Sequence, residues 1–226
     1  MTDTAQLPPA IPAATVVVVR DGPEGVETLM LRRNSKVAFG GMWAFPGGKV
    51  DPVDHADDDE LTARRCAVRE AAEEADLVLG HDALAPFAHW EPPPVISRRF
   101  ATWFFLAQLP PGPDGDVLVD GGEIDEHRWL SARRVLEERD AGTIELAPPT
   151  WVTLHDLSSF DSGRDAMAWA AGHVEIPRYV THWREVDGGA VAMWHGDAGY
   201  ESSDPFVAGP RHRLWMTGAG WRLERT

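Results

Sequence analysis

Short β-branched and apolar runs, separated by turns rich in glycine and proline, dominate the first half of the chain. The run 15–20 (TVVVVR) is typical of a buried strand, and the turn at 21–25 leads into a second predicted strand at 26–33. The segment 39–48 has the composition of a loop, and the acidic segment 51–59 predicts another loop. Further strands are predicted at 85–91, 98–108 and 123–130.

The segment 60–76 carries the strongest helical pattern in the chain. Three aspartates at 57–59 stand at its start, where the positive end of the helix dipole favours negative charge. Asp57 and Glu60 have the spacing of a capping box with Asp57 as the cap. Asp76 would end the helix, since Asp tolerates the left-handed conformation better than most residues. Additional helices are predicted at 131–139, 149–157 and 162–171.

Beyond residue 172 the pattern changes to short predicted strands, at 190–194 and 212–224, with glycine and proline between them. We therefore predict a flexible N-terminal arm at 1–13, a main domain at 14–172, and a β-rich C-terminal extension at 173–226. We expect the extension to pack on the main domain or on a partner subunit. The order of the elements favours an α+β fold, an α/β/α sandwich with a mixed sheet, over a doubly wound parallel sheet.

Composition narrows the possible functions. The formal net charge of −15 over 226 residues would repel nucleic-acid phosphates, so we expect no polynucleotide partner. No stretch reaches the roughly 18 apolar residues that a membrane span needs, and the first residues lack the pattern of a signal peptide. Cys66 is the only cysteine, which excludes an internal disulfide. We expect a cytoplasmic protein that does not bind membranes.

Three carboxylates of the predicted helix at 60–76 share one broad face. Glu70 and Glu74 lie nearly in line one turn apart, and Glu73 falls beside them. Such like charges destabilise a bare helix by a few tenths of a kcal/mol per pair, roughly, and a hard divalent cation would offset that repulsion. The alternative is a solvated acidic face. The turn Phe45-Pro46-Gly47-Gly48 just before it favours a site, because glycines let backbone come close to a ligand or to the helix.

These segments resemble the Nudix box, G-x5-E-x7-R-E-U-x-E-E-x-G-U, where U is aliphatic. Asp54 stands where the box has its first Glu, and Asp76 replaces the late glycine. The gap between Asp54 and Arg69 is 14 residues (55–68), twice that of the box. The matching positions are Gly48, Asp54, Arg69, Glu70, Glu73, Glu74 and Leu77. The resemblance implies that Glu70, Glu73 and Glu74 bind Mg²⁺ or Mn²⁺ at a diphosphate, that water attacks phosphorus, and that Arg69 orients the loop and helix.

One branch of this family, the peroxisomal coenzyme A diphosphatases with an insert inside the box, is similar over nearly the whole chain. The insert here is much shorter, and the peroxisomal C-terminal signal is absent. The matching stretches are 29–33, 45–48 with Asp51 and Asp54, 66–71, 98–100, 104–106, 148–149, and 196–197 with Tyr200.

Other residues gain interest from the resemblance. Arg33 and Arg99 fall near the expected phosphates, which arginine can grip with two hydrogen bonds; the alternative is an ordinary surface arginine. Glu123 is a candidate further metal ligand or general base, with Glu126 as its rival and surface solvation as the alternative for both. Tryptophans such as Trp43 and Trp90 could stack on an adenine, although packing is the commoner role of tryptophan.

The sequence therefore predicts a metal-dependent hydrolase of a nucleoside diphosphate linked to another group. Coenzyme A or an acyl derivative is the first expected substrate, followed by ADP-ribose or a dinucleotide such as NADH. The predicted roles are catalytic for Glu73, Arg69 and Glu123, substrate-binding for Arg33, Arg99 and Gly48, and metal-binding for Glu70, Glu73 and Glu74. The alternatives are a Nudix module that binds a nucleotide without cleaving it, and a structural helix. The expected partner is a small nucleotide-type substrate, and a homodimer is compatible with the resemblance.

Overall fold

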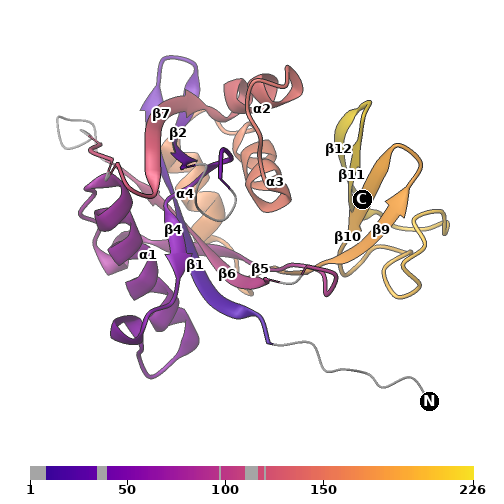
Figure 1. The fold of residues 1–226 in the computed structure, drawn as a ribbon, viewed down its shortest axis with the longest axis horizontal. Helices are drawn as coiled ribbons and strands as arrows, with labels where there is room; N and C mark the ends of the chain where they lie inside the picture. Colours follow the sequence, from indigo (N-terminus) through magenta and orange to yellow (C-terminus); the bar gives the residue numbers. More distant parts are fainter. Residues whose placement is uncertain (1–8, 35–39, 97, 110–116, 120) are drawn as a thin grey trace. The chain divides into compact units, whose positions relative to one another are not determined.

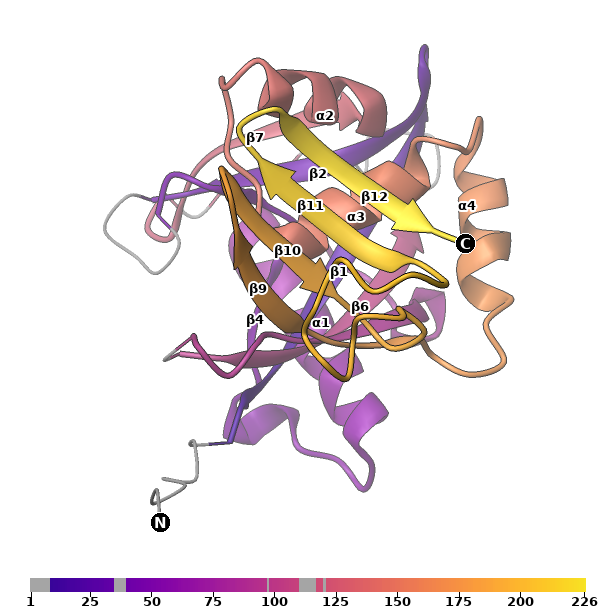
Figure 2. The ribbon, with the colours of Figure 1, turned by 90° about the vertical axis from the view of Figure 1, so that its right-hand side faces the viewer.

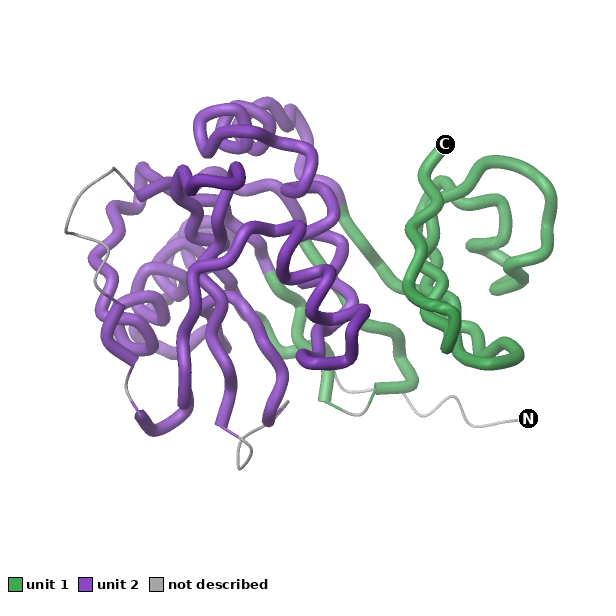
Figure 3. Tube along the Cα trace, turned by 90° about the horizontal axis from the view of Figure 1, so that it is seen from above, with its two compact units in different colours: residues 1–12, 89–102, 178–226 green, residues 13–88, 103–177 purple. Residues whose placement is uncertain are grey.

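The structure is a computed structural model that describes residues 9–34, 40–96, 98–109, 117–119 and 121–226. The chain divides into two compact units (Figure 3). Unit 2 contains residues 13–88 and 103–177, and unit 1 contains residues 1–12, 89–102 and 178–226. The predicted N-terminal arm at 1–13 falls largely outside the described residues, and the first strand begins at Ile11.

Unit 2 is organised on a hairpin of two strands, β1 (Ile11–Gly22) and β2 (Gly25–Arg33) (Figure 1). The strands pair antiparallel, with Val19 opposite Thr28 and Gly22 opposite Gly25. Every residue of the valine run 16–19 is buried, whereas a strand with one solvated face would alternate. The valines therefore lie in a central strand that is covered on both faces.

The main sheet is mixed. Its strand order is β3-β2-β1-β6-β5-β8, with β4 also paired to β1 and β7 to β2. The β2–β7 pair is antiparallel, and β5 pairs with β8 in parallel. The further strands are β3 (Trp43–Ala44), β4 (Gly47–Lys49), β5 (Ala85–Glu91), β6 (Phe100–Gln108), β7 (Ile124–Ser131) and β8 (Arg178–Val180).

Helices cover the two faces of the part of this sheet that belongs to unit 2. Helix α1 (Asp59–Ala75) lies on one side, and α2 (Ala132–Asp140), α3 (Pro148–Leu157) and α4 (Gly163–Ala171) lie on the other (Figure 1). The buried face of α1 consists of small side chains, which let the helix approach the strands closely. These side chains are Ala63, Cys66, Ala67, Ala71 and Ala75, packed against Val16, Val18, Leu29, Leu31 and Phe105.

The ends of α1 differ in part from the prediction. The cap is Asp58, whose side chain accepts a hydrogen bond from the Leu61 backbone, so the capping role predicted for Asp57 is wrong. The C-terminal end follows the prediction, because Asp76 adopts the left-handed conformation with φ of 55°. The Leu77 backbone N–H then donates to the Ala71 carbonyl, a 6→1 bond that satisfies the last turn.

Unit 1 contains a separate antiparallel sheet with the order β12-β11-β10-β9 (Figure 2). Its strands are β9 (His182–Val186), β10 (Gly189–Met193), β11 (His212–Thr217) and β12 (Gly220–Arg225). The loop between β10 and β11 is fastened by Asp197 and Arg213, an ion pair whose side chains are 0% and 1% exposed. Strands β8 and β9 escaped the sequence prediction because they are short and Tyr179 is their one buried residue, so no apolar alternation marks them.

The predicted α+β architecture with a mixed sheet and a small β-rich part at the C-terminus is confirmed. Two short 3₁₀ helices, η1 (Pro52–Asp54) and η2 (His81–Ala83), flank α1. Among the described helices, none combines the length and the apolar character required to cross a membrane.

Candidate active site

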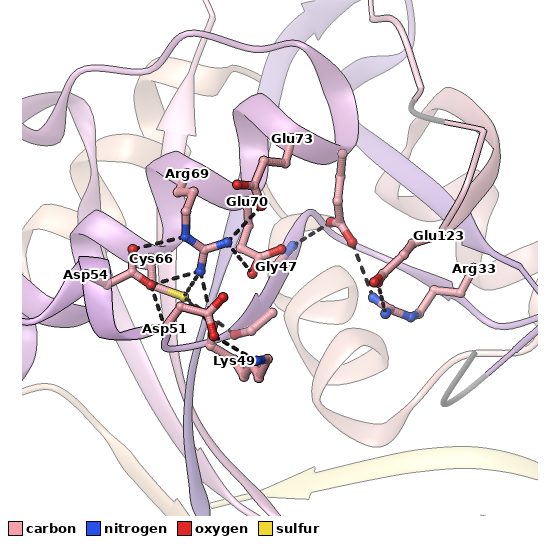
Figure 4. Close-up of polar contacts among 12 residues, drawn as sticks. Arg33, Gly47, Lys49, Asp51, Asp54, Cys66, Arg69, Glu70, Glu73 and Glu123 are labelled. Atoms are coloured by element: carbon pink, nitrogen blue, oxygen red, sulfur yellow. Dashed lines mark hydrogen bonds and ion pairs between the residues drawn. The ribbon is translucent and has the colours of Figure 1, made fainter.

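Strand β4 and helix α1 bring the predicted site residues together in unit 2. β4 pairs with β1, with Gly47 opposite Thr15 and Gly48 opposite Ala14. The side chains of Arg69, Glu70 and Glu73 extend from α1 toward the strand and the loop that follows it (Figure 4). The glycine turn and the acidic helix, which are separate in the sequence, therefore form one site.

Arg69 is the centre of a charge network (Figure 4). Its Nε and Nη2 atoms donate to the two carboxylate oxygens of Asp54 at 3.0 and 2.8 Å. Its Nη1 atom donates to Glu70 at 2.9 Å and to Glu73 at 2.8 Å. A further bond reaches the Lys49 backbone carbonyl at 3.1 Å. Arg69 thus ties the loop after β4 to the acidic face of α1.

Asp54 is the buried partner of Arg69, with 2% of its surface exposed. Burial alone would raise the pKa of Asp54, but its hydrogen bonds with Arg69 and with the Asp51 backbone outweigh that effect and lower the pKa below its usual range. The hydrogen bond with Asp54 in turn raises the pKa of the Arg69 guanidinium. The pair is therefore fully charged at neutral pH.

Glu74 is the most deeply buried of the three helix carboxylates, with 5% of its surface exposed. Its two oxygens accept from the Gly47 backbone N–H at 2.9 Å and from Arg33 Nη1 at 3.4 Å. Burial raises the pKa of Glu74 to about 7, although both of these donors act to lower it. Glu74 carries a charge that its surroundings stabilise only in part.

Glu70 lies against the backbone of Gly48. A Cβ atom at position 48 would overlap the Glu70 carboxylate, so only glycine leaves room for that side chain. Burial raises the pKa of Glu70, although Arg69 acts in the opposite direction. The absence of a side chain at Gly48 therefore leaves the space that the Glu70 carboxylate occupies, and Gly48 contacts that carboxylate in this structure.

Glu73 and Glu123 form the exposed part of the site. Their side chains are 59% and 61% exposed. Arg33 joins Glu123 to the buried part, because its Nη2 lies 3.1 Å from Glu123 while its Nη1 lies 3.4 Å from Glu74 (Figure 4). Glu126 faces elsewhere and pairs with Arg32 and Arg128.

One predicted site residue, Arg99, lies in a different unit of the chain from the carboxylates. It belongs to unit 1, where its backbone carbonyl accepts a hydrogen bond from Ile11, whereas the carboxylates belong to unit 2. Its predicted contact with substrate phosphates therefore stays a prediction.

Sequence reasoning missed two backbone contributions to the site. The Gly47 backbone N–H and the Lys49 carbonyl both bind site side chains, and backbone groups leave no signal in a sequence. Cys66 lies beside Asp54 and Arg69, and its Sγ donates to the Lys49 carbonyl at 3.3 Å. Burial raises the pKa of this thiol to about 12, so Cys66 is a packing residue and a poor nucleophile.

The donor set has the chemistry that a hard divalent cation takes, since carboxylate oxygens are its preferred ligands. Within the described ranges, however, no three metal-binding side chains converge closely enough to hold an ion. The contacts give the reason: Arg69 draws Glu70 and Glu73 toward itself, while Glu74 turns to Gly47 and Arg33.

A family model described as NUDIX domain matches residues 10–148 of the chain. Among solved structures, the chain is similar to a NUDIX hydrolase from Alicyclobacillus acidocaldarius, with a TM-score of 0.65 and 26% identity over 73% of this chain and 97% of that one. No curated protein matches the sequence significantly.

Two more distant structures share the fold alone. The NUDIX domain of Shewanella oneidensis NrtR, solved in complex with ADP ribose, has a TM-score of 0.51 and 16% identity, covering 68% of this chain and 89% of that one. A MutT NUDIX hydrolase from Burkholderia pseudomallei has a TM-score of 0.50 and 19% identity, covering 66% and 98%.

The fold and the acidic helix thus define an α/β/α protein built around a phosphoanhydride-hydrolase motif. The chain belongs to the NUDIX domain family and is a Nudix hydrolase. Enzymes of this family typically depend on a divalent metal.

Proposed function

We propose that this Nudix hydrolase cleaves the phosphoanhydride bond of coenzyme A or an acyl-coenzyme A in a metal-dependent reaction. The observation that carries the proposed chemistry is the arrangement of Glu70, Glu73 and Glu74 on one face of α1, beside the glycine backbone of β4. Two of these carboxylates have raised pKa values because of burial, so their negative charge is poorly compensated without a further cation.

Glu70, Glu73 and Glu74 are the proposed metal ligands. When held by these carboxylates, Mg²⁺ or Mn²⁺ would supply Lewis-acid stabilisation of the diphosphate charge and would make a water molecule more acidic. Binding requires that Glu70 and Glu73 exchange their bonds with Arg69 for the ion. Because the two bonds from Arg69 to Asp54 do not involve Glu70 or Glu73, Arg69 can release these carboxylates and still be held by Asp54.

The general base is proposed to be Glu73 or Glu123. Both are exposed enough to reach an attacking water, whereas Glu74 is enclosed by Gly47 and Arg33. Arg33 lies between Glu74 and Glu123, where its guanidinium would meet the phosphates and neutralise their charge. Arg99 is proposed as a second phosphate contact, and Gly48 as the point where the backbone comes nearest to the substrate.

The substrate proposal rests on the resemblance to the coenzyme A diphosphatases, carried by residues inside and outside the box. The alternatives are ADP-ribose and a dinucleotide of the NADH type. ADP-ribose is included because a NUDIX domain of the same fold was solved in complex with it. A non-catalytic nucleotide-binding module is the second candidate function, favoured by the way Arg69 occupies Glu70 and Glu73.

Chromatographic product analysis tests the proposal. The protein would be incubated with Mg²⁺ and coenzyme A, acetyl-coenzyme A, ADP-ribose or NADH, alongside the variants Glu74→Gln and Glu60→Gln. Glu60 is the matched control, because it lies on the same helix but pairs with Arg64 away from the site. We expect metal-dependent release of a nucleotide from coenzyme A or acetyl-coenzyme A, retained in Glu60→Gln and lost in Glu74→Gln.

Other outcomes would contradict particular parts of the proposal. Full turnover by Glu74→Gln would overturn the metal assignment. Cleavage of ADP-ribose or NADH alone would replace the substrate. Binding of a nucleotide without any cleavage would establish the non-catalytic module.

A further inference from the structure

The pairing of β2 with β7 is irregular beside the carboxylate site. Arg32 lies opposite Glu126, whereas Arg33 lies opposite Ile124, so over this stretch β7 contains one residue more than β2, namely Asp125. Such a β-bulge changes the direction of the side chains next to it, and bulges are over-represented beside active sites. The bulge therefore determines which residue of this segment comes next to Arg33.

The two neighbouring arginines of β2 have different carboxylate partners. Leu31 packs in the core beneath α1, and alternate residues of a strand share a face, so Arg33 lies on the α1 face of the sheet and Arg32 on the other. Arg32 pairs with Glu126 at 3.2 Å. Arg33 pairs with Glu123 at 3.1 Å, on the side of the catalytic helix (Figure 4).

A regular strand would bring a different residue to Arg33. In an antiparallel pair, each step along one strand is matched by one step back along the other. Extending the pairing of Arg32 with Glu126 by one step would therefore place Asp125 opposite Arg33 and move Glu123 one position further from it. A shift of one residue also reverses the face on which each side chain lies. The bulge thus makes Glu123, and not Asp125, the carboxylate that reaches Arg33.

Asn34 binds the residues on both sides of Ile124. It follows β2 directly, and its backbone N–H donates to the Glu123 carbonyl at 2.7 Å. Its side-chain Nδ2 donates to the Asp125 carboxylate at 3.0 Å. Asn34 therefore fixes the backbone of Glu123 and, through its amide, engages the carboxylate that a regular strand would present to Arg33.

We propose that Asn34 and Asp125 are positioning residues that hold the Glu123 carboxylate at Arg33, beside Glu74. This assignment rests on the proposed role of Glu123 in the reaction and adds the interaction that keeps Glu123 in place. Both residues act through the bulge of β7, so their loss should lower the rate of the reaction more than the affinity for substrate.

Exchanging the two side chains tests the proposal, with whichever compound of the substrate panel is cleaved. Asn34→Asp places two carboxylates against each other. We expect kcat to fall roughly tenfold with little change in KM, since a displacement of about 1 Å can lower a rate by on the order of 10²-fold. Adding Asp125→Asn restores an amide–carboxylate hydrogen bond in the reverse direction, so we expect the double variant to regain most of the wild-type kcat. Asp140→Asn is the matched control, because Asp140 forms an exposed pair on α2 and should leave kcat unchanged.

Hydrogen exchange of the segments 29–34 and 121–131 requires no turnover and therefore tests the placement of Glu123 separately from the proposed function. We expect faster exchange in Asn34→Asp, and wild-type exchange in the double variant and in Asp140→Asn. If the double variant restored neither exchange nor kcat, the proposal would be overturned.

The variant Glu123→Gln distinguishes failure of this proposal from failure of the proposed function. A loss of kcat in Glu123→Gln without any loss in Asn34→Asp would overturn the positioning role and leave the role of Glu123 in place. Full turnover by Glu123→Gln, combined with exchange that the double variant restores, would refute the role of Glu123 in the reaction and support its placement by Asn34.

Discussion

Arg69 holds both carboxylate oxygens of Asp54, at 3.0 and 2.8 Å, although residues 55–68 separate the two in the chain. The pair thus holds together the two ends of a 14-residue segment. The segment forms a short loop and the first ten residues of α1, and the pair connects the start of the loop to the third turn of the helix.

Asp54→Asn tests how much this pair stabilises the protein. Asparagine keeps the size of the side chain but leaves the Arg69 guanidinium without its buried counter-charge, so we expect a loss of about 3 kcal/mol in unfolding free energy. Urea denaturation measures it. Asp57→Asn, an exposed position before the helix, should change the same quantity by no more than about 0.5 kcal/mol. Equal stability of the two variants would show that Arg69 finds other partners.

Gly48→Ala tests whether the glycine is required by Glu70. The added methyl group would displace the Glu70 carboxylate, and a displacement of about 1 Å can lower a rate by on the order of 10²-fold. We expect kcat/KM to fall by at least roughly tenfold while the protein stays folded by circular dichroism. Gly80→Ala is the control, because a Cβ there meets nothing within 4 Å. Full activity in Gly48→Ala would contradict the packing of Glu70 described above.

Glu74→Gln should stabilise the metal-free protein in a pH-dependent way. The pKa of Glu74 is about 7 in the folded protein and 4.5 in its ordinary state, so the folded protein binds the proton more tightly. Ionisation of Glu74 therefore opposes folding as the pH rises from 4.5 to 7, and below pH 4.5 both states are protonated. With a chelator present, we expect the variant to gain on the order of 3 kcal/mol above pH 7 and nothing below pH 4.5. Thermal unfolding across this range measures the difference, and a gain independent of pH would refute the explanation.

Asp197→Asn should destabilise the small sheet of unit 1. Burial alone would raise the pKa of Asp197, but Arg213 and two backbone N–H groups lower it below its usual range. The carboxylate therefore stabilises the fold at neutral pH, and that contribution is lost as the pH falls through its lowered pKa. Breaking such a buried pair costs about 3–5 kcal/mol. Hydrogen exchange of β10 and β11 would detect the loss of stability. Arg222→Gln is the control, because it breaks an exposed ion pair and should lower the unfolding free energy by no more than about 1 kcal/mol. Unchanged exchange in Asp197→Asn would contradict this role.

The sequence predicted the elements that have a strong periodic signal. The valine run of β1, the hairpin to β2 and the helix α1 all appear near their predicted bounds, because burial of both sheet faces and of one helix face leaves a pattern in the residues. Strands β8 and β9 are held by backbone pairing with neighbours, which leaves little trace in side-chain character.

The grouping of the carboxylates on one helix could be predicted, whereas the geometry around each of them could not. The glutamates at 70, 73 and 74 were identified from their spacing, but nothing in the spacing says that Glu74 is buried while Glu73 is exposed. That difference comes from the approach of the Gly47 backbone and of Arg33. Similarly, the spacing does not indicate that Asp58 rather than Asp57 caps the helix, because the conformation of the loop before α1 determines which side chain reaches the Leu61 backbone N–H.

The Asp54–Arg69 pair also affects where this protein can accept additional residues. The pair joins the two ends of segment 55–68. Residues inserted near Ala56 would therefore lengthen a loop whose two ends are already held together. Enlarging a closed loop costs only about 0.6 kcal/mol for each doubling of its length. The segment is therefore a position where new sequence can be added, in evolution or by engineering, while the acidic face of α1 stays in place.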